Sequence, residues 1–355
     1  MKITVIGGGN IGTLMAAEMA AKGHAVTMFT SKPQKWNKQL QVYDAAEKLL
    51  LTGCLTAVTS DLQEAVQDAE MIFVTMPAET FSDLAKRLLP VVHAGQYIGI
   101  VPGSGGVELV MHALIEKGCV LFGLQRVHSI ARLKQYGSAV YMLGRKSELH
   151  TASIPQRYAA DIAQKLESMF DMPCHVLKNY LAVTLTPSNP ILHTSRLYAM
   201  FHDYAPDVFY PKNILFYEEW DDTSSEVLFQ CDAELQELCR VLPFPLDEVV
   251  SLKKHYESDT VPAMTHKIRS IPAFHGLTSP MCQTEQGWIP DLTSRYFVSD
   301  FAYGLKVIRD IMQLFAVDCP MISTVWNWYQ ALDAGQHDTF ELTLNQEKFL
   351  RIYRL

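Results

Sequence analysis

Hydrophobic residues follow two different patterns along the chain. As far as about residue 178, short apolar runs of strand length alternate with longer stretches in which apolar residues recur at helical spacing. This alternation predicts a parallel sheet with helices on its faces. The runs that we expect to form strands cover residues 2–6, 25–30, 71–76, 97–101, 120–124, 138–143 and 174–177.

Helical spacing dominates from about residue 179 to the end of the chain. It is clearest over residues 228–242, 302–315 and 321–332, and prolines separate these segments. We therefore predict an α/β fold. It consists of a Rossmann-type, doubly wound parallel sheet over residues 1–178, followed by an all-α domain over residues 179–355.

The sequence GGGNIG, at residues 7–12, stands between the first predicted strand and a predicted helix. In that position a GxGxxG pattern is typical of dinucleotide binding. Gly7 allows a tight turn, Gly9 lets the backbone approach a pyrophosphate, and Gly12 lets the helix pack closely on the strand. Asn10 and Ile11 open the helix, where free N–H groups face the phosphates. The alternative is a glycine turn that serves packing alone.

Two other strand ends carry candidate cofactor-binding residues. The strand at 71–76 ends at Met76 and Pro77, where the carboxyl edge of the sheet would meet the ligand. The strand at 25–30 ends in Thr30, Ser31 and Lys32, without the acidic residue that usually binds the ribose 2′-hydroxyl of NAD. Two hydroxyls and a lysine suit a 2′-phosphate, so we expect NADP(H) to be favoured over NAD(H). A solvated surface lysine is the alternative interpretation of Lys32.

Composition and charge narrow the classes of function. The net charge is −8 and no basic run occurs, which argues against nucleic acid as a partner. The seven cysteines are scattered and contain no CxxC pair, so they predict no metal site and fit a reducing, cytoplasmic location. No apolar run approaches the ~18 residues of a membrane helix, and no signal peptide precedes the first strand, so we expect no membrane association.

A hydride-transfer enzyme also needs a group that gives or takes a proton, and a histidine steadied by a carboxylate suits this task. Two stretches of the second domain contain such residues: LTPSNPILHTSRLY, with His193, and SRYFVSDFAYGL, with Asp300. Together with GGGNIG, they resemble the opine dehydrogenase family of the octopine/nopaline type. The resemblance implies that His193, in an NPxxH motif, is the catalytic histidine and that Asp300, in an RYFxxD segment, pairs with it. The stretch RLKQYG at residues 132–137 also resembles a family segment.

The resemblance further implies the reaction. The amino group of an amino acid attacks a 2-oxo acid such as pyruvate, water leaves, and NAD(P)H reduces the imine to an N-(carboxyalkyl) amino acid. His193 would polarise and protonate the oxygen of the 2-oxo acid, with Asp300 behind it. A positioned acid–base group of this kind contributes roughly 10²–10⁴ in rate.

Both substrates carry carboxylates, so the pocket needs fixed cations. Arg295 and Arg132 are the candidates, because a planar guanidinium suits bidentate carboxylate binding. A surface ion pair is the alternative for each arginine. Asn189 is a third candidate for substrate binding, through a hydrogen bond to a substrate or cofactor amide, although it could equally cap the helix that begins near Pro190.

Two other functions remain open at this point. A 2-oxo acid reductase similar to ketopantoate reductase would share the opening residues and the domain order, but such enzymes use a lysine–asparagine pair where this chain has His193. A non-catalytic NADP(H) sensor would keep GGGNIG without a buried His–Asp pair. The sequence does not specify the oligomeric state, and a homodimer through the helical domain is compatible with it.

Overall fold

The computed structural model of the chain describes residues 1–332 and 341–355. The chain divides into two compact units. The first unit contains Met1–Thr184 together with Glu347–Leu355, and the second contains Leu185–Gln346.

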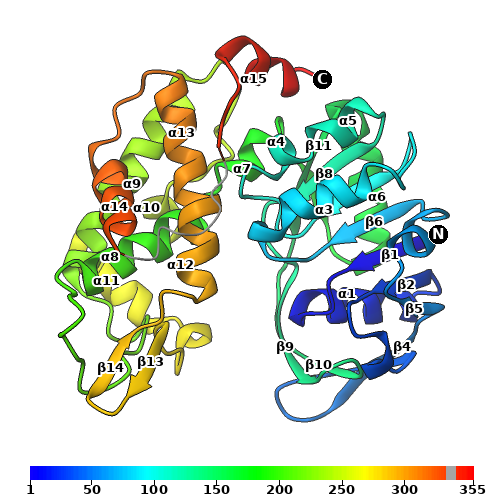
Figure 1. Cartoon of the computed structure of the whole chain (residues 1–355), viewed down its shortest axis with the longest axis horizontal. Coiled ribbons are helices and arrows are strands. Elements are labelled where there is room, and N and C mark those ends of the chain that lie inside the picture. The colour runs from blue at the N-terminus through cyan, green and yellow to red at the C-terminus, as the bar shows by residue number, and fades with distance from the viewer. Residues whose placement is uncertain (333–340) are drawn as a thin grey trace. The chain divides into compact units, whose positions relative to one another are not determined.

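A sheet of eight strands forms the centre of the first unit (Figure 1). Its strands are β1 (Lys2–Ile6), β2 (Ala25–Phe29), β5 (Ala57–Thr59), β6 (Met71–Val74), β7 (Tyr97–Ile100), β8 (Val120–Leu124), β11 (Leu149–Ile154) and β12 (Cys174–Val176). Their order is β12-β11-β8-β7-β6-β1-β2-β5, and all neighbours are parallel except β8 and β11. This order confirms the predicted doubly wound sheet.

The topology of this sheet makes the carboxyl end of β1 a candidate ligand site. The chain passes from β1 to β2 on one side and later to β6 on the other. The carboxyl end of β1 is therefore a switch point, where open α/β sheets leave a crevice for ligands. Every residue of β6 and of β8 is buried, as expected for parallel strands that are covered on both faces.

A second, four-stranded sheet in this unit has no counterpart in the sequence prediction. It consists of β3 (Gln39–Tyr43), β4 (Leu49–Cys54), β9 (Ser129–Gln135) and β10 (Ala139–Arg145), in the order β4-β3-β10-β9. Residues 138–143, which we expected to continue the large sheet, belong to this one instead. Helix α1 (Asn10–Ala21) lies between the two sheets (Figure 1). It approaches β4 so closely that a Cβ at Gly53 would lie 2.3 Å from the carbonyl oxygen of Ala17.

The remaining helices of the first unit are short except for one. Asp61 caps the first of them, α2, by accepting hydrogen bonds from the N–H groups of Gln63 and Glu64. The longest helix, α6, buries Ile162 and Leu166 at helical spacing in the core. These helices are α2 (Leu62–Val66), α3 (Phe81–Leu88), α4 (Val107–Val110), α5 (His112–Glu116), α6 (Ala159–Phe170) and α7 (Leu181–Thr184).

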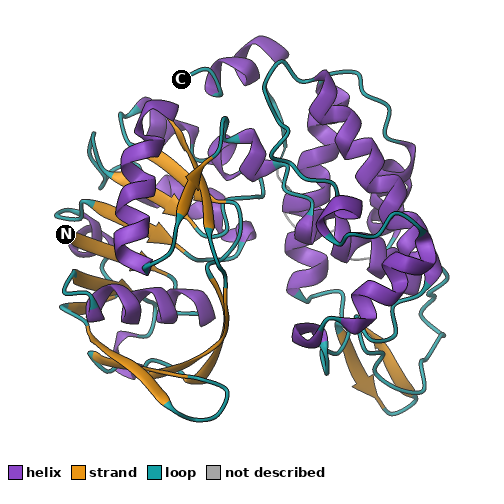
Figure 2. Cartoon of the chain, turned by 180° about the vertical axis from the view of Figure 1, so that it is seen from behind, coloured by secondary structure: helices purple, strands orange, loops and turns teal. Residues whose placement is uncertain are grey.

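The described part of the second unit is helical, as predicted, and contains one short β-hairpin in addition (Figure 2). Its helices are α8 (Thr194–Phe201), α9 (Asp222–Val241), α10 (Leu252–His255), α11 (Val261–Ser270), α12 (Arg295–Asp300), α13 (Lys306–Leu314) and α14 (Pro320–Ala331). Two π-helical turns, Ser188–His193 and Phe301–Leu305, lead into α8 and α13. The hairpin pairs β13 (Met281–Thr284) with β14 (Gly287–Pro290).

The ends of the helical unit differ from the boundaries expected from the sequence. Residues up to Thr184 pack with the first unit, and the C-terminal helix α15 (Gln346–Ile352) leads the chain back to it. The Asn179 side chain donates a hydrogen bond to the carbonyl oxygen of Tyr353, and the Tyr353 hydroxyl donates to the buried carboxyl of Glu108. These polar contacts, with the burial of Phe349, explain why the last residues of the chain belong to the first unit.

Candidate active site

Residues 7–12 form the turn between β1 and α1. Gly7 has a φ of +112°, in the region that side-chain-bearing residues rarely adopt. A Cβ at Gly12 would lie 1.9 Å from the carbonyl oxygen of Gly7, so only glycine lets the helix begin this close to the strand. A Cβ at Gly9 would meet nothing within 4 Å, and no side chain caps the helix there. The backbone at Gly9 is thus open, and the first N–H groups of α1 can bind an anion.

Asn10 and Ile11, the other candidates in this turn, are both half-buried. The Asn10 side chain accepts a hydrogen bond of 2.8 Å from the N–H group of Leu133, on β9. Asn10 therefore fixes the glycine turn to the second sheet. Ile11 packs against the hydrophobic core of the unit.

Thr75, which follows β6 directly, was not among the site residues predicted from the sequence. The Thr75 hydroxyl donates a hydrogen bond of 2.9 Å to the carbonyl oxygen of Gly7. Met76 lies beside the same turn, since a Cβ at Gly7 would come within 3.1 Å of its side chain, whereas Pro77 is exposed. A threonine placed directly after a wholly apolar strand was the signal available in the sequence.

Thr30, Ser31 and Lys32 follow β2 at the same edge of the sheet. Thr30 is buried, and its hydroxyl lies 3.1 Å from that of Tyr136, in the turn between β9 and β10. Ser31, Lys32 and the nearby Lys35 are exposed. Burial raises the pKa of Tyr136, but the hydrogen bond with Thr30 and the charges of Lys32 and Lys35 help to bring the net pKa below its usual value. The region therefore carries a local positive field, without an acidic residue at the strand end.

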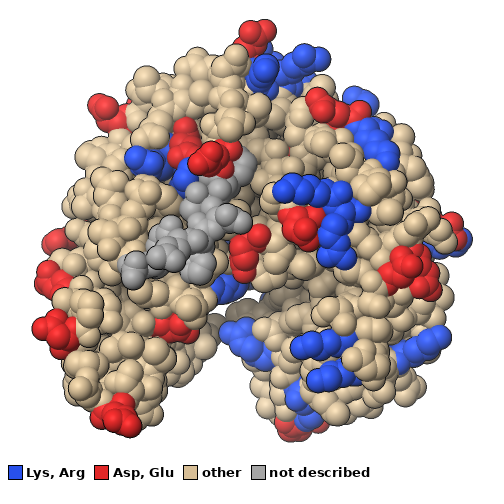
Figure 3. Space-filling view, in the orientation of Figure 1, with Lys and Arg blue, Asp and Glu red and all other residues tan. Residues whose placement is uncertain are grey.

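Positive charge is also visible on the surface of this unit. Figure 3 shows Lys and Arg side chains gathered over the part where Figure 1 draws β4, β9 and β10. The protein as a whole carries a net charge of −8, so this is a local enrichment. A local field of this sign favours anionic ligands.

His193 lies in the second unit, at the end of the first π-helical turn. Pro190 has no N–H group to donate, and the Thr194 hydroxyl donates to the Pro190 carbonyl oxygen at 2.6 Å, so the regular helical bonding changes here. The second π-helical turn packs against the first, since a Cβ at Gly304 would lie 3.2 Å from Pro190. This close packing brings Asp300, which directly precedes the second turn, to His193.

Nδ1 of His193 lies 2.8 Å from Oδ2 of Asp300, and both side chains are buried. A carboxylate only accepts hydrogen bonds, so Nδ1 carries the proton and donates it to Asp300. Nε2 of His193 lies 2.9 Å from the hydroxyl of Tyr217. The two contacts fix the ring orientation and the tautomer, as a group that exchanges protons in a defined direction requires.

Aromatic rings surround this pair. The Tyr296 ring lies 4.6 Å from the His193 ring, and the Phe216 ring meets it edge-on at 5.6 Å. Tyr217 stacks on Phe274 with a centroid separation of 4.0 Å. Burial raises the pKa of Tyr217 well above its usual value, so the phenol stays protonated. Tyr217 was not predicted from the sequence, because nothing in its neighbouring residues indicates that it meets His193.

The three candidate substrate-binding residues lie in different places. Arg295 is exposed at the start of α12, and its guanidinium lies 5.8 Å from the centre of the Tyr296 ring, which itself contacts His193. Asn189 is half-buried in the turn that ends at His193. Arg132 lies on β9 of the first unit, and its Nη1 donates to the carbonyl oxygen of Ala131. The structure therefore brings Arg295 and Asn189, but not Arg132, into the same unit as the His193–Asp300 pair.

Arg196, one turn after His193, holds the segment that carries Tyr217. It is 1% exposed. Its guanidinium donates to the carbonyl oxygens of Phe216 and Glu219 and to the hydroxyl of Ser224. Burial lowers the pKa of Arg196 to about 10, although the nearby carboxylate of Asp221 opposes this shift. Arg196 is therefore a structural cation and not one offered to a substrate.

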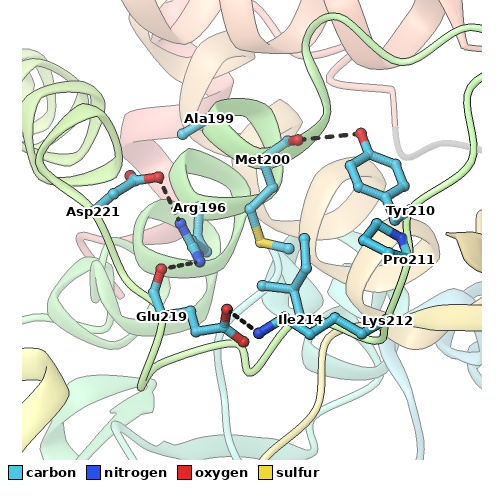
Figure 4. A pocket seen from close by; sticks show the side chains of 9 residues that line it. All are labelled: Arg196, Ala199, Met200, Tyr210, Pro211, Lys212, Ile214, Glu219 and Asp221. Carbon is cyan, nitrogen blue, oxygen red and sulfur yellow. Dashed lines mark hydrogen bonds and ion pairs between the residues drawn. The ribbon is translucent and has the colours of Figure 1, made fainter.

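A pocket of about 360 Å³ opens beside this segment (Figure 4). Its charged groups are paired with each other: Arg196 lies 3.3 Å from Asp221, and Lys212 lies 2.7 Å from Glu219. Such pairing leaves little free charge for a ligand. The lining residues are Arg196, Ala199, Met200, Tyr210, Pro211, Lys212, Ile214, Glu219 and Asp221.

Residues 1–332 and 341–355 contain neither a cluster of metal ligands nor a helix that could span a membrane. No group of three His, Cys, Asp or Glu side chains in this part of the chain is arranged to hold a metal ion. None of the helices described in it combines the length and the apolar character that crossing a membrane requires.

Two different family models match the two parts of the chain. The family model for the alpha-helical domain of NAD/NADP octopine/nopaline dehydrogenases matches residues 176–333. A model described as NADP oxidoreductase, coenzyme F420-dependent, matches residues 2–98. The first match contains His193 and Asp300, and the second contains the glycine turn.

Relatives and solved structures match over nearly the whole chain. The tauropine dehydrogenase of Arabella iricolor is 23% identical over 365 residues, which cover 93% of this chain and 91% of that protein. An octopine dehydrogenase solved with NADH and pyruvate has a TM-score of 0.83 at 21% identity, covering 93% of this chain and 88% of that one. A yersinopine dehydrogenase solved with NADP⁺ has a TM-score of 0.70 at 11% identity, covering 93% and 90%. Together, these matches support the opine dehydrogenase family of NAD(P)-dependent oxidoreductases for this chain.

Proposed function

We propose that the protein condenses an amino acid with a 2-oxo acid such as pyruvate and reduces the product with NAD(P)H to an N-(carboxyalkyl) amino acid. The observation that carries this proposal is the buried contact of 2.8 Å between His193 and Asp300. A nucleotide sensor would have no use for a buried acid–base pair. A reductase similar to ketopantoate reductase would use a lysine in this region, where the chain has His193.

In this proposal the residues of the helical unit handle protons and bind carboxylates. His193 is the source of the proton that the carbonyl oxygen of the 2-oxo acid takes as the amine attacks, and the carboxylate of Asp300 stabilises the imidazolium form. Arg295 binds one substrate carboxylate through its planar guanidinium, and Arg132 is the candidate for the second. Asn189 orients the substrate by a hydrogen bond. The bound cofactor supplies the hydride.

The glycine turn is the proposed cofactor site. The open backbone at Gly9 and the uncapped N-terminus of α1 suit a pyrophosphate, and Asn10 and Ile11 contribute N–H groups there. Met76 and Pro77, after β6, would line the cofactor at the neighbouring strand end. Both are at the edge of the sheet where the switch point lies.

We expect this site to favour NADP(H) over NAD(H). Thr30, Ser31 and Lys32 stand where an acidic residue would bind the 2′-hydroxyl of NAD. Lys35 and Tyr136 add a second cation and a phenol to the same place. A 2′-phosphate carries negative charge and accepts hydrogen bonds, so these groups suit it better than a bare ribose hydroxyl.

The test is oxidation of NADPH and NADH by the purified protein with pyruvate and a pool of amino acids, with mass spectrometry of the products. The proposal predicts a product whose mass equals that of the amino acid plus pyruvate, less one oxygen atom. It also predicts that omitting the amine abolishes cofactor oxidation. Oxidation with the oxo acid alone would indicate a simple reductase. Tight NADPH binding without any turnover would indicate a sensor.

A further inference from the structure

The second nitrogen of His193 is already occupied in the structure. Nδ1 donates to Asp300, so Nε2 is the only ring atom that can exchange a proton with a substrate. The Tyr217 hydroxyl lies 2.9 Å from Nε2. A substrate oxygen that was to bond Nε2 directly would have to displace this hydroxyl.

Displacement would disturb several contacts at once. The Tyr217 ring stacks on Phe274 at 4.0 Å and lies parallel to the Trp220 ring at an interplanar angle of 5°. Its backbone is held on both sides, because Arg196 donates to the carbonyl oxygen of Phe216 and Arg269 donates to that of Trp220. A side chain fixed in this way does not move aside easily, but its hydroxyl is well placed to pass on a proton.

We infer that the Tyr217 hydroxyl passes the proton from His193 to the carbonyl oxygen of the 2-oxo acid. Tyr217 is then the third member of an Asp300–His193–Tyr217 chain and the group that touches the reacting oxygen. The inference rests on the proposed function for the identity of the substrate, and on the geometry of the helical unit for the order of the three groups.

Two protons move as the amine attacks. The amine nitrogen forms a bond to the carbonyl carbon, and the electron pair of the C=O π bond moves to the oxygen. That oxygen takes the hydroxyl proton of Tyr217, and the Tyr217 oxygen takes the Nε2 proton of the imidazolium. His193 becomes neutral, and its Nδ1 keeps the proton that it donates in the hydrogen bond to Asp300. The imidazolium is restored by a proton that the incoming ammonium group of the amino acid releases.

The chemistry of a phenol fits this concerted transfer. The pKa of Tyr217 lies well above its usual value because of burial, so a free tyrosinate is disfavoured. The hydroxyl can give up its proton readily only if it receives another in the same step. The contact with Nε2 supplies that second proton.

The experiment compares Tyr217→Phe with Tyr210→Phe in the full chain. Tyr217→Phe keeps the ring on Phe274 and removes only the hydroxyl. Tyr210 belongs to the same segment, and its hydroxyl bonds the carbonyl oxygen of Met200 at 3.4 Å, away from His193. We expect Tyr217→Phe to lower kcat roughly 10²-fold, with KM for pyruvate, cofactor affinity and melting temperature close to wild type. Tyr210→Phe should retain wild-type kcat.

Each outcome decides between the relay and its alternatives. If Tyr217→Phe keeps wild-type kcat, the hydroxyl is only a lid over Nε2 and the relay is wrong, while the proposed function stands. If wild type reduces pyruvate without an amine and Tyr217→Phe loses this activity, the condensation is wrong and the relay stands, because the same oxygen takes the proton. If the wild-type protein shows no turnover on any of these substrates, both the condensation and the relay are wrong.

Discussion

Nδ1 of His193 and Oδ2 of Asp300 are 2.8 Å apart, although 107 positions separate the two residues in the sequence. Two π-helical turns, packed together at Pro190 and Gly304, produce this contact. Turns of this kind are rare and often occur at functional sites. The contact orients the imidazole and leaves its Nε2 facing Tyr217, so the proposed acid–base function of the site depends on it.

The His193–Asp300 pair gives the first prediction. His193→Ala should lower kcat by roughly 10²–10⁴, because it removes the acid–base group. Asp300→Asn should lower kcat by a similar or smaller factor, because the amide no longer stabilises the imidazolium. The dissociation constant for NADPH, measured by fluorescence, should stay near wild type in both variants, since the glycine turn belongs to the other unit.

A second histidine–aspartate pair in the helical unit provides the control. His202 and Asp203 lie 3.2 Å apart on the surface, and His202→Ala should leave kcat unchanged. Wild-type turnover in both His193→Ala and Asp300→Asn would show that the active site lies elsewhere.

The residues after β2 give the second prediction. Lys32→Glu should move the cofactor preference from NADPH towards NADH, because a carboxylate repels the 2′-phosphate and can bind the 2′-hydroxyl. We expect a change of at least 10-fold in the ratio of kcat/KM for the two cofactors, or about 1.4 kcal/mol. Lys2→Glu makes the same change of charge at the amino end of β1, on the edge of the sheet opposite to Lys32, and should leave the ratio unaltered. An unchanged ratio in Lys32→Glu would remove Lys32 from the cofactor site.

Arg196 gives the third prediction. Arg196→Lys keeps the positive charge but cannot reach the carbonyl oxygens of Phe216 and Glu219 and the Ser224 hydroxyl together. Buried acceptors lose their donors, so the free energy of unfolding should fall by about 2–3 kcal/mol. Turnover should also fall, because the segment that holds Tyr217 loosens. Denaturant titration and steady-state kinetics measure the two effects.

The exposed Arg240, paired with Glu237, is the matched control for this change. Arg240→Lys should alter the free energy of unfolding by less than about 0.5 kcal/mol. Equal stabilities of Arg196→Lys and wild type would mean that Arg196 does not hold the segment.

Local sequence patterns were sufficient for the large sheet and the glycine turn, since both depend on neighbouring residues. The apolar run of β6 and the glycines at positions 7, 9 and 12 are local signals of this kind. The second sheet was missed because its strands β3 and β4 are half-exposed and lack a continuous apolar run. Its pairing of β3 with β10 joins segments about 100 positions apart, which no local pattern encodes.

The polar contacts of the site depend on tertiary structure even more strongly. His193 and Asp300 were chosen on a resemblance, and nothing in their neighbouring residues predicts that the two meet. Tyr217 reaches His193 because Arg196 and Arg269 fix the backbone around it, and a sequence contains no direct record of such contacts. The return of Tyr353 to Glu108 was missed for the same reason.

Glu108 gives the fourth prediction, which concerns stability. It is fully buried in the first unit, where its Oε1 accepts hydrogen bonds from Thr184 and Tyr353 and its Oε2 has no partner. Burial raises its pKa to about 7, although both hydrogen bonds oppose this shift. The neutral form is thus favoured in the folded protein. In the unfolded chain the same carboxyl ionises near its ordinary pKa of 4.5.

The sign of the effect on stability follows from proton binding. Between pH 4.5 and about 7 the folded state keeps a proton that the unfolded state has lost, so the free energy of unfolding falls as the pH rises. The contribution of Glu108 is fully present below pH 4.5 and is lost on passing through pH 7, with a size on the order of 3 kcal/mol. Glu108→Gln cannot ionise, so the difference in unfolding free energy between wild type and this variant should shrink or reverse over that range. Denaturant titrations at pH 5, 6, 7 and 8 measure it, with the exposed Glu116→Gln as the control. A difference between wild type and Glu108→Gln that does not change with pH would show that Glu108 is ionised throughout and that the docked C-terminal segment tolerates its charge.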